Sequence, residues 1–139
     1  MEIQTREFRI EDYQAAIELW NRLEGLDIAE GDDRETIRRF LQRNPGLSRV
    51  AMDDAAMVGA VLCGHDGRRG YVYHLAVDPT FRGHGIGRRL IGECLAGLKQ
   101  AGLERANILV ADDNPRGLEF WSSCGWEHLD GARPLGIDI

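Results

Sequence analysis

Apolar residues recur along this chain with two different periods, and these periods divide it into helices and strands. Spacings of three and four positions link Ile10, Tyr13, Ile17, Trp20 and Leu23, which predicts a helix over residues 11–24 with one buried face. The same spacing is kept most regularly over residues 85–101 and predicts the longest helix there. Charged residues occupy the other face of each stretch, so both helices are expected to pack against a core on one side only.

Shorter stretches rich in β-branched and aromatic residues predict strands. Residues 71–77, with the sequence YVYHLAV, are the strongest of these, and Pro79 ends them. A hairpin is expected around residues 53–56, and the tail over residues 126–138 has room for one or two more strands. The remaining predicted strands cover residues 3–9, 47–53, 57–64 and 105–111.

Capping residues place the ends of the remaining helices. Asp32 and Glu35 match a capping box, so a second helix is expected to begin at Asp32. The Asn-Pro-Gly sequence at residues 44–46 stops this helix. Asn114 precedes a proline and is expected to cap a short last helix, which ends at Gly125.

The predicted elements follow the order β-α-α-β-β-β-α-β-α-β, with room for one more strand at the end, so that antiparallel hairpins come first and strand-helix-strand units afterwards. This order is typical of a mixed α/β domain and not of an alternating, doubly wound one. The chain has 139 residues, of which 43% are apolar and 29% are charged. Those values predict one globular domain over residues 1–139.

Charge and composition exclude several classes of protein. The net charge is −6, from 23 acids and 17 bases, which disfavours a general nucleic-acid binder because such proteins present a basic face. No apolar run approaches the ~18–20 residues of a membrane-spanning helix, and the first ten residues lack the apolar stretch of a signal peptide. We therefore expect a cytoplasmic protein. Its cysteines are expected to be buried free thiols, because no metal-site spacing links Cys63, Cys94 and Cys124.

The segment of residues 82–89, RGHGIGRR, carries the first sign of chemistry. Glycines at its second, fourth and sixth positions let the backbone approach a ligand closely. The helix that follows points free N–H groups and its positive dipole end at the same place, which favours phosphate binding. Arg82, Arg88 and Arg89 can add positive charge there.

Glycine spacing alone leaves three interpretations open. A dinucleotide-binding motif needs G-x-G-x-x-G directly after a strand, whereas this segment has G-x-G-x-G, and residues 78–81 separate it from the strand. A plain turn followed by a helix cap explains the glycines as well. The third interpretation is the pattern R-x-x-G-x-G after a strand that ends in LAV. A Walker A loop is excluded, because the chain has no Gly-Lys-Ser/Thr sequence.

Three segments together resemble a known family. They are HLAVDP at residues 74–79, RGHGIG at residues 82–87 and NPRGLEFWSSCGW at residues 114–126. The last is similar to the signature N-x-x-A-x-x-F-Y-x-x-x-G-F, of which the Asn, Phe and Gly match. In this combination the chain resembles the GNAT N-acetyltransferase superfamily.

The resemblance implies a central, mostly antiparallel sheet flanked by helices, with the strands at residues 71–77 and 105–111 splayed apart to admit a thioester. It also implies acetyl-CoA as co-substrate and no metal. The backbone of the first strand would pair with the pantetheine arm, the glycine loop would hold the pyrophosphate, and Asn114 would contact the CoA arm. The cofactor-binding positions implied are Leu75, Ala76, Val77, Arg82, Gly83, His84, Gly85, Ile86, Gly87, Arg88, Asn114 and Trp121.

The chain departs from the family at the position of a proton donor. Family members often use a Tyr there, but this chain has Trp121, whose indole N–H hydrogen-bonds and does not give up its proton at neutral pH. Trp121 is therefore expected to pack against the cofactor or the core. Alternation along the strand places Tyr71, Tyr73 and Leu75 on one face, toward the implied acyl-transfer centre, which makes Tyr73 the catalytic candidate as a proton-relay or orienting residue. His74 is a candidate base by residue type, because histidine titrates near neutral pH, but alternation turns it to the opposite face.

The function expected from these features is transfer of an acetyl group from acetyl-CoA to a primary amine of a small molecule or a protein. One alternative is a CoA-sensing domain of the same fold without turnover, and another is a structural domain whose glycine loop is only a turn. A homodimer through a C-terminal strand is implied by analogy alone. Acids in the loop over residues 25–32 and just after it either attract a cationic amine or are simply solvated; they are Asp27, Glu30, Asp32 and Asp33.

Overall fold

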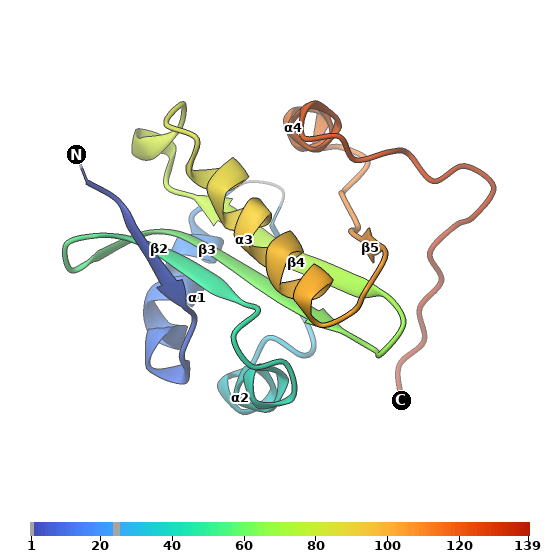
Figure 1. Cartoon of the computed structure of the whole chain (residues 1–139), viewed down its shortest axis with the longest axis horizontal. Helices are drawn as coiled ribbons and strands as arrows, with labels where there is room; N and C mark the ends of the chain where they lie inside the picture. Colours follow the sequence, from blue (N-terminus) through green and yellow to red (C-terminus); the bar gives the residue numbers. More distant parts are fainter. Residues whose placement is uncertain (1, 24–25) are drawn as a thin grey trace. The chain divides into compact units, whose positions relative to one another are not determined.

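The computed structural model describes residues 2–23 and 26–139, and its centre is a five-stranded sheet whose strands pair in chain order (Figure 1). The pairs from the first to the fourth strand are antiparallel, and the fifth strand runs parallel to the fourth. The predicted mixed α/β class with a mostly antiparallel sheet is confirmed. The strands are β1 (Gln4–Glu7), β2 (Arg49–Asp53), β3 (Ala56–His65), β4 (Gly70–Val77) and β5 (Ala106–Asn107).

The helices follow the predicted order with small changes at their ends. The helix predicted over residues 11–24 is a 3₁₀ turn followed by α1, and its last predicted residue lies outside the described residues. The helix predicted over residues 85–101 is observed with one residue fewer at each end. The helical elements are Ile10–Asp12 (3₁₀), α1 (Tyr13–Asn21), α2 (Arg34–Arg43), Pro79–Phe81 (3₁₀), α3 (Ile86–Gln100) and α4 (Pro115–Ser123).

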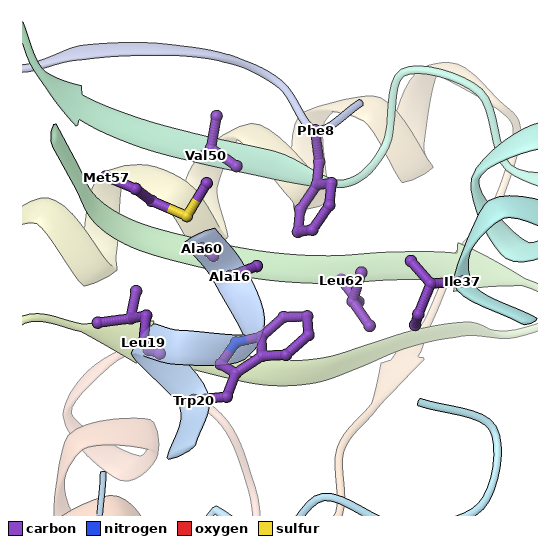
Figure 2. Packing of buried hydrophobic residues seen from close by; sticks show 10 residues of the cluster. Phe8, Ala16, Leu19, Trp20, Ile37, Val50, Met57, Ala60 and Leu62 are labelled. Carbon is purple, nitrogen blue, oxygen red and sulfur yellow. The ribbon is translucent and has the colours of Figure 1, made fainter. Parts of the chain in front are cut away.

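Helices cover both faces of the sheet. Trp20 of α1 and Ile37 of α2 belong to one buried cluster with Ala60 and Leu62 of β3 (Figure 2). Ala60 faces that cluster, whereas the preceding residue, Gly59, lies against side chains of α3. Alternate residues of β3 therefore face opposite helical layers, which explains why eight of its ten residues are buried.

A β-bulge interrupts the pairing between β3 and β4. Tyr73 pairs with Leu62 and Ala76 pairs with Ala60, so two residues of β4 lie opposite the single Val61. The first of these two residues, His74, has a φ of 52°. Such a bulge shifts the alternation of side chains by one position, and strict alternation past residue 73 is therefore a wrong prediction.

Two other predicted strands differ from the structure. The strand expected over residues 105–111 is reduced to Ala106–Asn107, because its ladder with β4 extends only to Tyr71. Residues 126–139 form neither a helix nor a strand. Their apolar alternation continues to the end of the chain, but Leu135 and Ile137 are 97% and 91% exposed. A strand needs a partner to be stable, and the described residues supply none to this tail.

The chain divides into two compact units between Leu109 and Val110. The first unit contains the whole sheet with α1 to α3, and the second contains α4 and the tail. The prediction of one domain over residues 1–139 stays a prediction. Within the described residues, the helices are all too short or too polar to cross a membrane. Cys63 and Cys94 are buried free thiols as predicted, whereas Cys124 is only partly buried.

Candidate active site

The glycine loop of residues 82–85 turns the chain from the 3₁₀ turn into α3. Gly83 and Gly85 have φ values of 81° and 76°, a left-handed backbone that other residues rarely adopt. A Cβ atom at either position would meet no atom within 4 Å. The glycines are therefore required by the backbone and also leave open space beside it, as predicted for a loop that a ligand approaches.

The first turn of α3 offers free donors to that open space. Gly85 is the N-cap residue of this 15-residue helix and supplies no side-chain acceptor. The first N–H groups of a helix have no partner within the helix, so those of Ile86 and Gly87 are available to an anion. The side chain of Ile86 is buried in the core, and only the backbone of this predicted cofactor-binding residue can serve a ligand.

The basic residues around the loop divide into two groups. Arg89 donates to the backbone carbonyl of Ile3 at 2.8 Å and lies 3.5 Å from Glu93, so it ties α3 to the start of the chain. His84 places Nδ1 3.0 Å from the carbonyl oxygen of Phe81 and holds the turn. Arg82, by contrast, is exposed on the loop itself, where its guanidinium can meet a phosphate, and Arg88 is exposed in the first turn of α3.

Asp78 anchors the path from β4 into the loop. Its N–H donates to the carbonyl of Val58 on β3 at 2.8 Å, and its carboxylate accepts from the N–H and the hydroxyl of Thr80 at 2.9 and 2.8 Å. These two bonds, with Arg22 and Arg82 nearby, lower the pKa of Asp78 below its usual value. The loop therefore starts from a fixed point at the end of the strand.

The edge of β4 beyond Tyr71 is left without a strand partner among the described residues, because the ladder with β5 stops there. Asp78 bonds to β3 through its N–H, and strand alternation counted back from it turns the backbone groups of Ala76 to β3 and those of Val77 to the unpaired edge. Leu75 belongs to the bulge, where alternation does not apply, so Val77 is the predicted backbone position that faces the edge. The pairing of the two strands ends after two residue pairs, as the predicted splay requires.

Tyr73 lies on the face of β4 that α1 and α2 cover. Its ring stacks on Tyr71 with a centroid distance of 6.1 Å and meets the edge of Phe40 of α2 at 6.2 Å. It remains 40% exposed. Burial of its hydroxyl, followed by the effects of Tyr71 and Asp66, raises the pKa of Tyr73, so the group keeps its proton at neutral pH.

The bulge corrects the predicted directions of two neighbours of Tyr73. Leu75 does not share its face, because Ala76 already belongs to the cluster on the α1 side. His74, predicted to point away, lies on the α1 side: its ring centroid is 5.1 Å from that of Trp20. His74 Nε2 also lies 3.0 Å from both carboxylate oxygens of Asp32. Strict alternation failed here because the bulge inserts one extra residue.

The contact of Asp32 with His74 was not predicted from the sequence. The N-cap of α2 is Asp33, whose carboxylate accepts from the N–H of Thr36 at 3.1 Å, so the predicted cap is wrong by one residue. Asp32 is buried instead of solvated, with 9% of its surface exposed. The pair of adjacent aspartates was the available signal, because only one of two neighbouring carboxylates can fill the N-cap position.

The second unit contains the two remaining predicted residues. Asn114 caps α4 as predicted, and its side-chain oxygen accepts from the N–H of Gly117 at 3.0 Å. Trp121 packs between Phe120 and Trp126, with ring centroids 5.4 and 5.0 Å away. The expected packing of Trp121 against the cofactor or the core stays a prediction, because both rings belong to the second unit and none of the residues of α4 is fully buried.

Comparison with known proteins places this chain among acetyltransferases. The family model described as "Acetyltransferase (GNAT) family" matches residues 6–126. The protein named acetyltransferase ECA0875 from Pectobacterium atrosepticum is 34% identical over 128 residues, which cover 92% of this chain and 90% of the relative.

Solved structures with similar folds agree with this assignment. The PaiA N-acetyltransferase from Thermoplasma acidophilum, solved with coenzyme A, has a TM-score of 0.80 at 20% identity and covers 95% of this chain and 94% of its own. Ard1 from Thermoplasma volcanium has a TM-score of 0.78 at 19% identity and covers 90% of this chain and 82% of its own. At these identities the likeness shows the fold.

Proposed function

This chain belongs to the acetyltransferase (GNAT) family and is an acyltransferase, and from that premise we propose that it transfers an acetyl group from acetyl-CoA directly to a primary amine. The observation that carries the proposal is the pairing of an open glycine loop with an unpaired strand edge in one compact unit. The loop suits a pyrophosphate, and the edge suits an extended arm that carries amide groups. Together they fit the two chemically different parts of CoA.

Different residues of the first unit would bind different parts of acetyl-CoA. The N–H groups at the start of α3 and the side chain of Arg82 would hold the pyrophosphate. The outward backbone groups of Val77 would pair with the pantetheine arm, and the contact of Leu75 with that arm stays a prediction from the family resemblance. Asn114 and Trp121, which belong to the second unit, stay predictions from the family resemblance.

The chemistry needs an amine without its extra proton, because only the free lone pair attacks a carbonyl carbon. The nitrogen–carbon bond then forms as the carbon–sulfur bond breaks. Backbone N–H groups at the edge of β4 are the donors available to the carbonyl oxygen as it gains charge. Tyr73 would orient the reactants or pass a proton to the departing sulfur, which also leaves readily by itself because a thiol has a pKa of ~8.5.

One specific feature supports a second candidate function. Trp121 stands where family members often have a proton-donating Tyr. A domain that senses CoA without turnover does not need that proton donor. Binding of acetyl-CoA without release of thiol across a broad panel of amines would favour this alternative. The panel should contain free lysine, N-terminal peptides and polyamines, because the fold does not select between small-molecule and protein acceptors.

Calorimetric titration with acetyl-CoA tests the proposal on the wild type and two matched variants. Gly85→Trp places an indole in the open space of the loop, whereas Gly67→Trp makes the same change at a residue with a φ of 94° and equally open space. Gly67 precedes β4 and the loop follows it, so the eight-residue strand, about 26 Å long, separates the two sites.

We expect micromolar binding by the wild type and by Gly67→Trp, and binding at least 100-fold weaker by Gly85→Trp. Absence of binding by the wild type at millimolar acetyl-CoA would contradict both the enzyme and the sensor. Equal losses in the two variants would mean that backbone strain, rather than occupation of the loop, controls affinity.

A further inference from the structure

The contact between His74 and Asp32 joins two segments that are 42 residues apart. His74 stands in the bulge of β4, and Asp32 ends the loop that leads into α2. The Nε2 atom of the imidazole lies 3.0 Å from each carboxylate oxygen. The two side chains are 21% and 12% exposed, so the pair is partly buried and still reachable.

Each partner is fixed by further bonds. The carboxylate of Asp32 accepts from the N–H of Ala29 at 3.0 Å, and its carbonyl accepts from the hydroxyl of Tyr13 at 2.6 Å. The carbonyl of His74 accepts from the indole N–H of Trp20 at 2.9 Å. His74 is therefore held at both its backbone carbonyl and its ring, which fixes the orientation of the imidazole.

The backbone of His74 adds a second, independent observation. Among the described residues other than glycine, only His74 and Asp54 have a positive φ, of 52° and 50°. Asp54 lies in the turn between β2 and β3, where such a value is ordinary. His74 lies within a strand, where a left-handed residue is maintained only by surrounding contacts and where such strain clusters at functional sites.

We propose that Asp32 and His74 form a general-base dyad that takes the proton from the acceptor amine. This inference rests on the proposed function, which names no general base, and supplies one. A carboxylate that accepts the Nε2–H leaves the lone pair on Nδ1, and a carboxylate that orients an imidazole in this way also stabilises the imidazolium that forms.

The proton balance of the reaction is complete with this dyad. An ammonium acceptor gives one proton to His74 Nδ1, and the resulting lone pair on nitrogen attacks the thioester carbonyl carbon. The carbon–sulfur bond breaks and its electron pair stays on sulfur. The second proton lost from nitrogen goes to that sulfur, so the products are the amide, the CoA thiol and a protonated His74, which returns its proton to water.

The surroundings of the dyad suit an ammonium substrate. The loop that holds Asp32 also carries the exposed acids Asp27 and Glu30, which draw a cation toward it. Among the neighbouring ionisable groups, Tyr13 of α1 donates to the carbonyl of Asp32, and Asp33 and Arg34 at the start of α2 act on the Tyr13 hydroxyl. Burial, then Asp33 and Asp32, raise the pKa of Tyr13, so its hydroxyl stays a donor that fixes the loop.

The test uses the full chain and compares His74→Gly with Asp54→Gly, which relieves the other positive φ without touching the dyad. Rates of thiol release are measured with a lysine-like amine, of pKa ~10.4, and with a peptide α-amine, of pKa ~7.7–8.0. We expect His74→Gly to lower kcat/KM for the first amine by roughly 10²–10⁴-fold, and for the second by less, because a far larger fraction of that amine is already unprotonated near neutral pH.

Three further readouts separate a base from a structural residue. Added imidazole should restore the rate of His74→Gly at least tenfold, the acetyl-CoA Kd should stay within twofold of the wild type, and Asp32→Asn should lower kcat at least tenfold. Asp54→Gly should leave all rates unchanged. If His74→Gly does not fold, His74→Asn carries the same test, because Asn tolerates a left-handed backbone and cannot accept the proton.

Two outcomes overturn the dyad while the proposed function stands. One is a rate within threefold of the wild type in the His74 variants. The other is an equal loss for both amines with no response to imidazole, which is the behaviour of a structural contact. A wild type that binds no acetyl-CoA would overturn the proposed function itself, and the dyad with it.

Discussion

The glycine loop that follows β4 and the bulge within β4 are two irregular pieces of backbone, and they are irregular for opposite reasons. In the loop, Gly83 and Gly85 adopt positive φ values freely, with open space where their Cβ atoms would lie. In the bulge, His74 adopts a similar φ although it has a side chain. Bonds from Trp20 and Asp32, which are far away in the sequence, maintain that conformation.

This difference separates a binding element from a positioning element. The shape of the loop depends on residue types within a few positions of it, so it should survive changes in the core that weaken the fold. The shape of the bulge depends on distant contacts, so changes beneath it should alter the reaction. The following predictions test that separation, beginning with the largest expected effect.

Leu90→Ala should cause the largest loss of stability. Leu90 is fully buried on α3, and removal of such a side chain costs about 2–5 kcal/mol of unfolding free energy. Urea denaturation measures this loss. We expect the acetyl-CoA Kd at 25 °C to stay within twofold, because the donors of the loop are backbone groups. A tenfold weaker Kd in the folded variant would show that the loop depends on the packing of α3.

Trp20→Phe should have a smaller effect on stability and a larger effect on the reaction. The substitution leaves the carbonyl of His74 without its indole donor, and an unpaired buried acceptor costs about 1–3 kcal/mol. We expect urea denaturation to show that loss, and kcat to fall while the acetyl-CoA Kd is unchanged.

Phe8→Leu is the matched control for Trp20→Phe. Phe8 is 1% exposed and stacks on Trp20 with a centroid distance of 6.1 Å, so its replacement disturbs the same cluster and keeps the indole N–H. The control should lose stability without loss of kcat. Equal falls of kcat in both variants would mean that general softening of the core, and not the bond to the bulge, affects the rate.

The sequence predicted the loop well and the bulge poorly, for physical reasons. Glycine spacing, a proline and a helical stripe act within a few residues, so the ends of α3 and the cap at Asn114 were predicted to within one residue. The bulge arises from the register between β3 and β4, which involves residues far apart in the chain. Strict alternation therefore gave the wrong face for His74.

The same reasoning explains the aspartate that was missed. The sequence pattern predicts an N-cap near residue 32 but does not distinguish between the adjacent carboxylates of Asp32 and Asp33. Asp33 takes that position, and Asp32 is left to turn inward to His74, a partner that only the folded chain brings near. The short length of β5 was also not predictable from local sequence, because it depends on how many residues of β5 pair with β4 in the folded chain.

Asp78→Asn should have the smallest effect, and it tests the residue that joins the two regions. The bonds from Thr80 lower the pKa of Asp78 in the folded chain, so its contribution to stability is present above the unfolded pKa of ~3.9 and is lost as the pH falls through the lowered value. The group is near the surface, so we expect less than about 1 kcal/mol.

Urea denaturation at pH 7, 5, 4 and 3 measures this contribution as the difference between wild type and Asp78→Asn. The difference should be constant from pH 7 to 5 and shrink toward pH 3. A difference that does not change with pH would contradict a stabilising carboxylate at this position.

The early end of the ladder between β4 and β5 has a consequence for how the protein behaves without a ligand. A strand edge that can receive an amide-bearing arm can also receive another polypeptide, and unpaired edges are templates for aggregation. A ligand that binds only the folded state stabilises it by mass action and, on this edge, also blocks such pairing. Preparations stored with CoA should therefore stay monodisperse for longer than preparations stored without it.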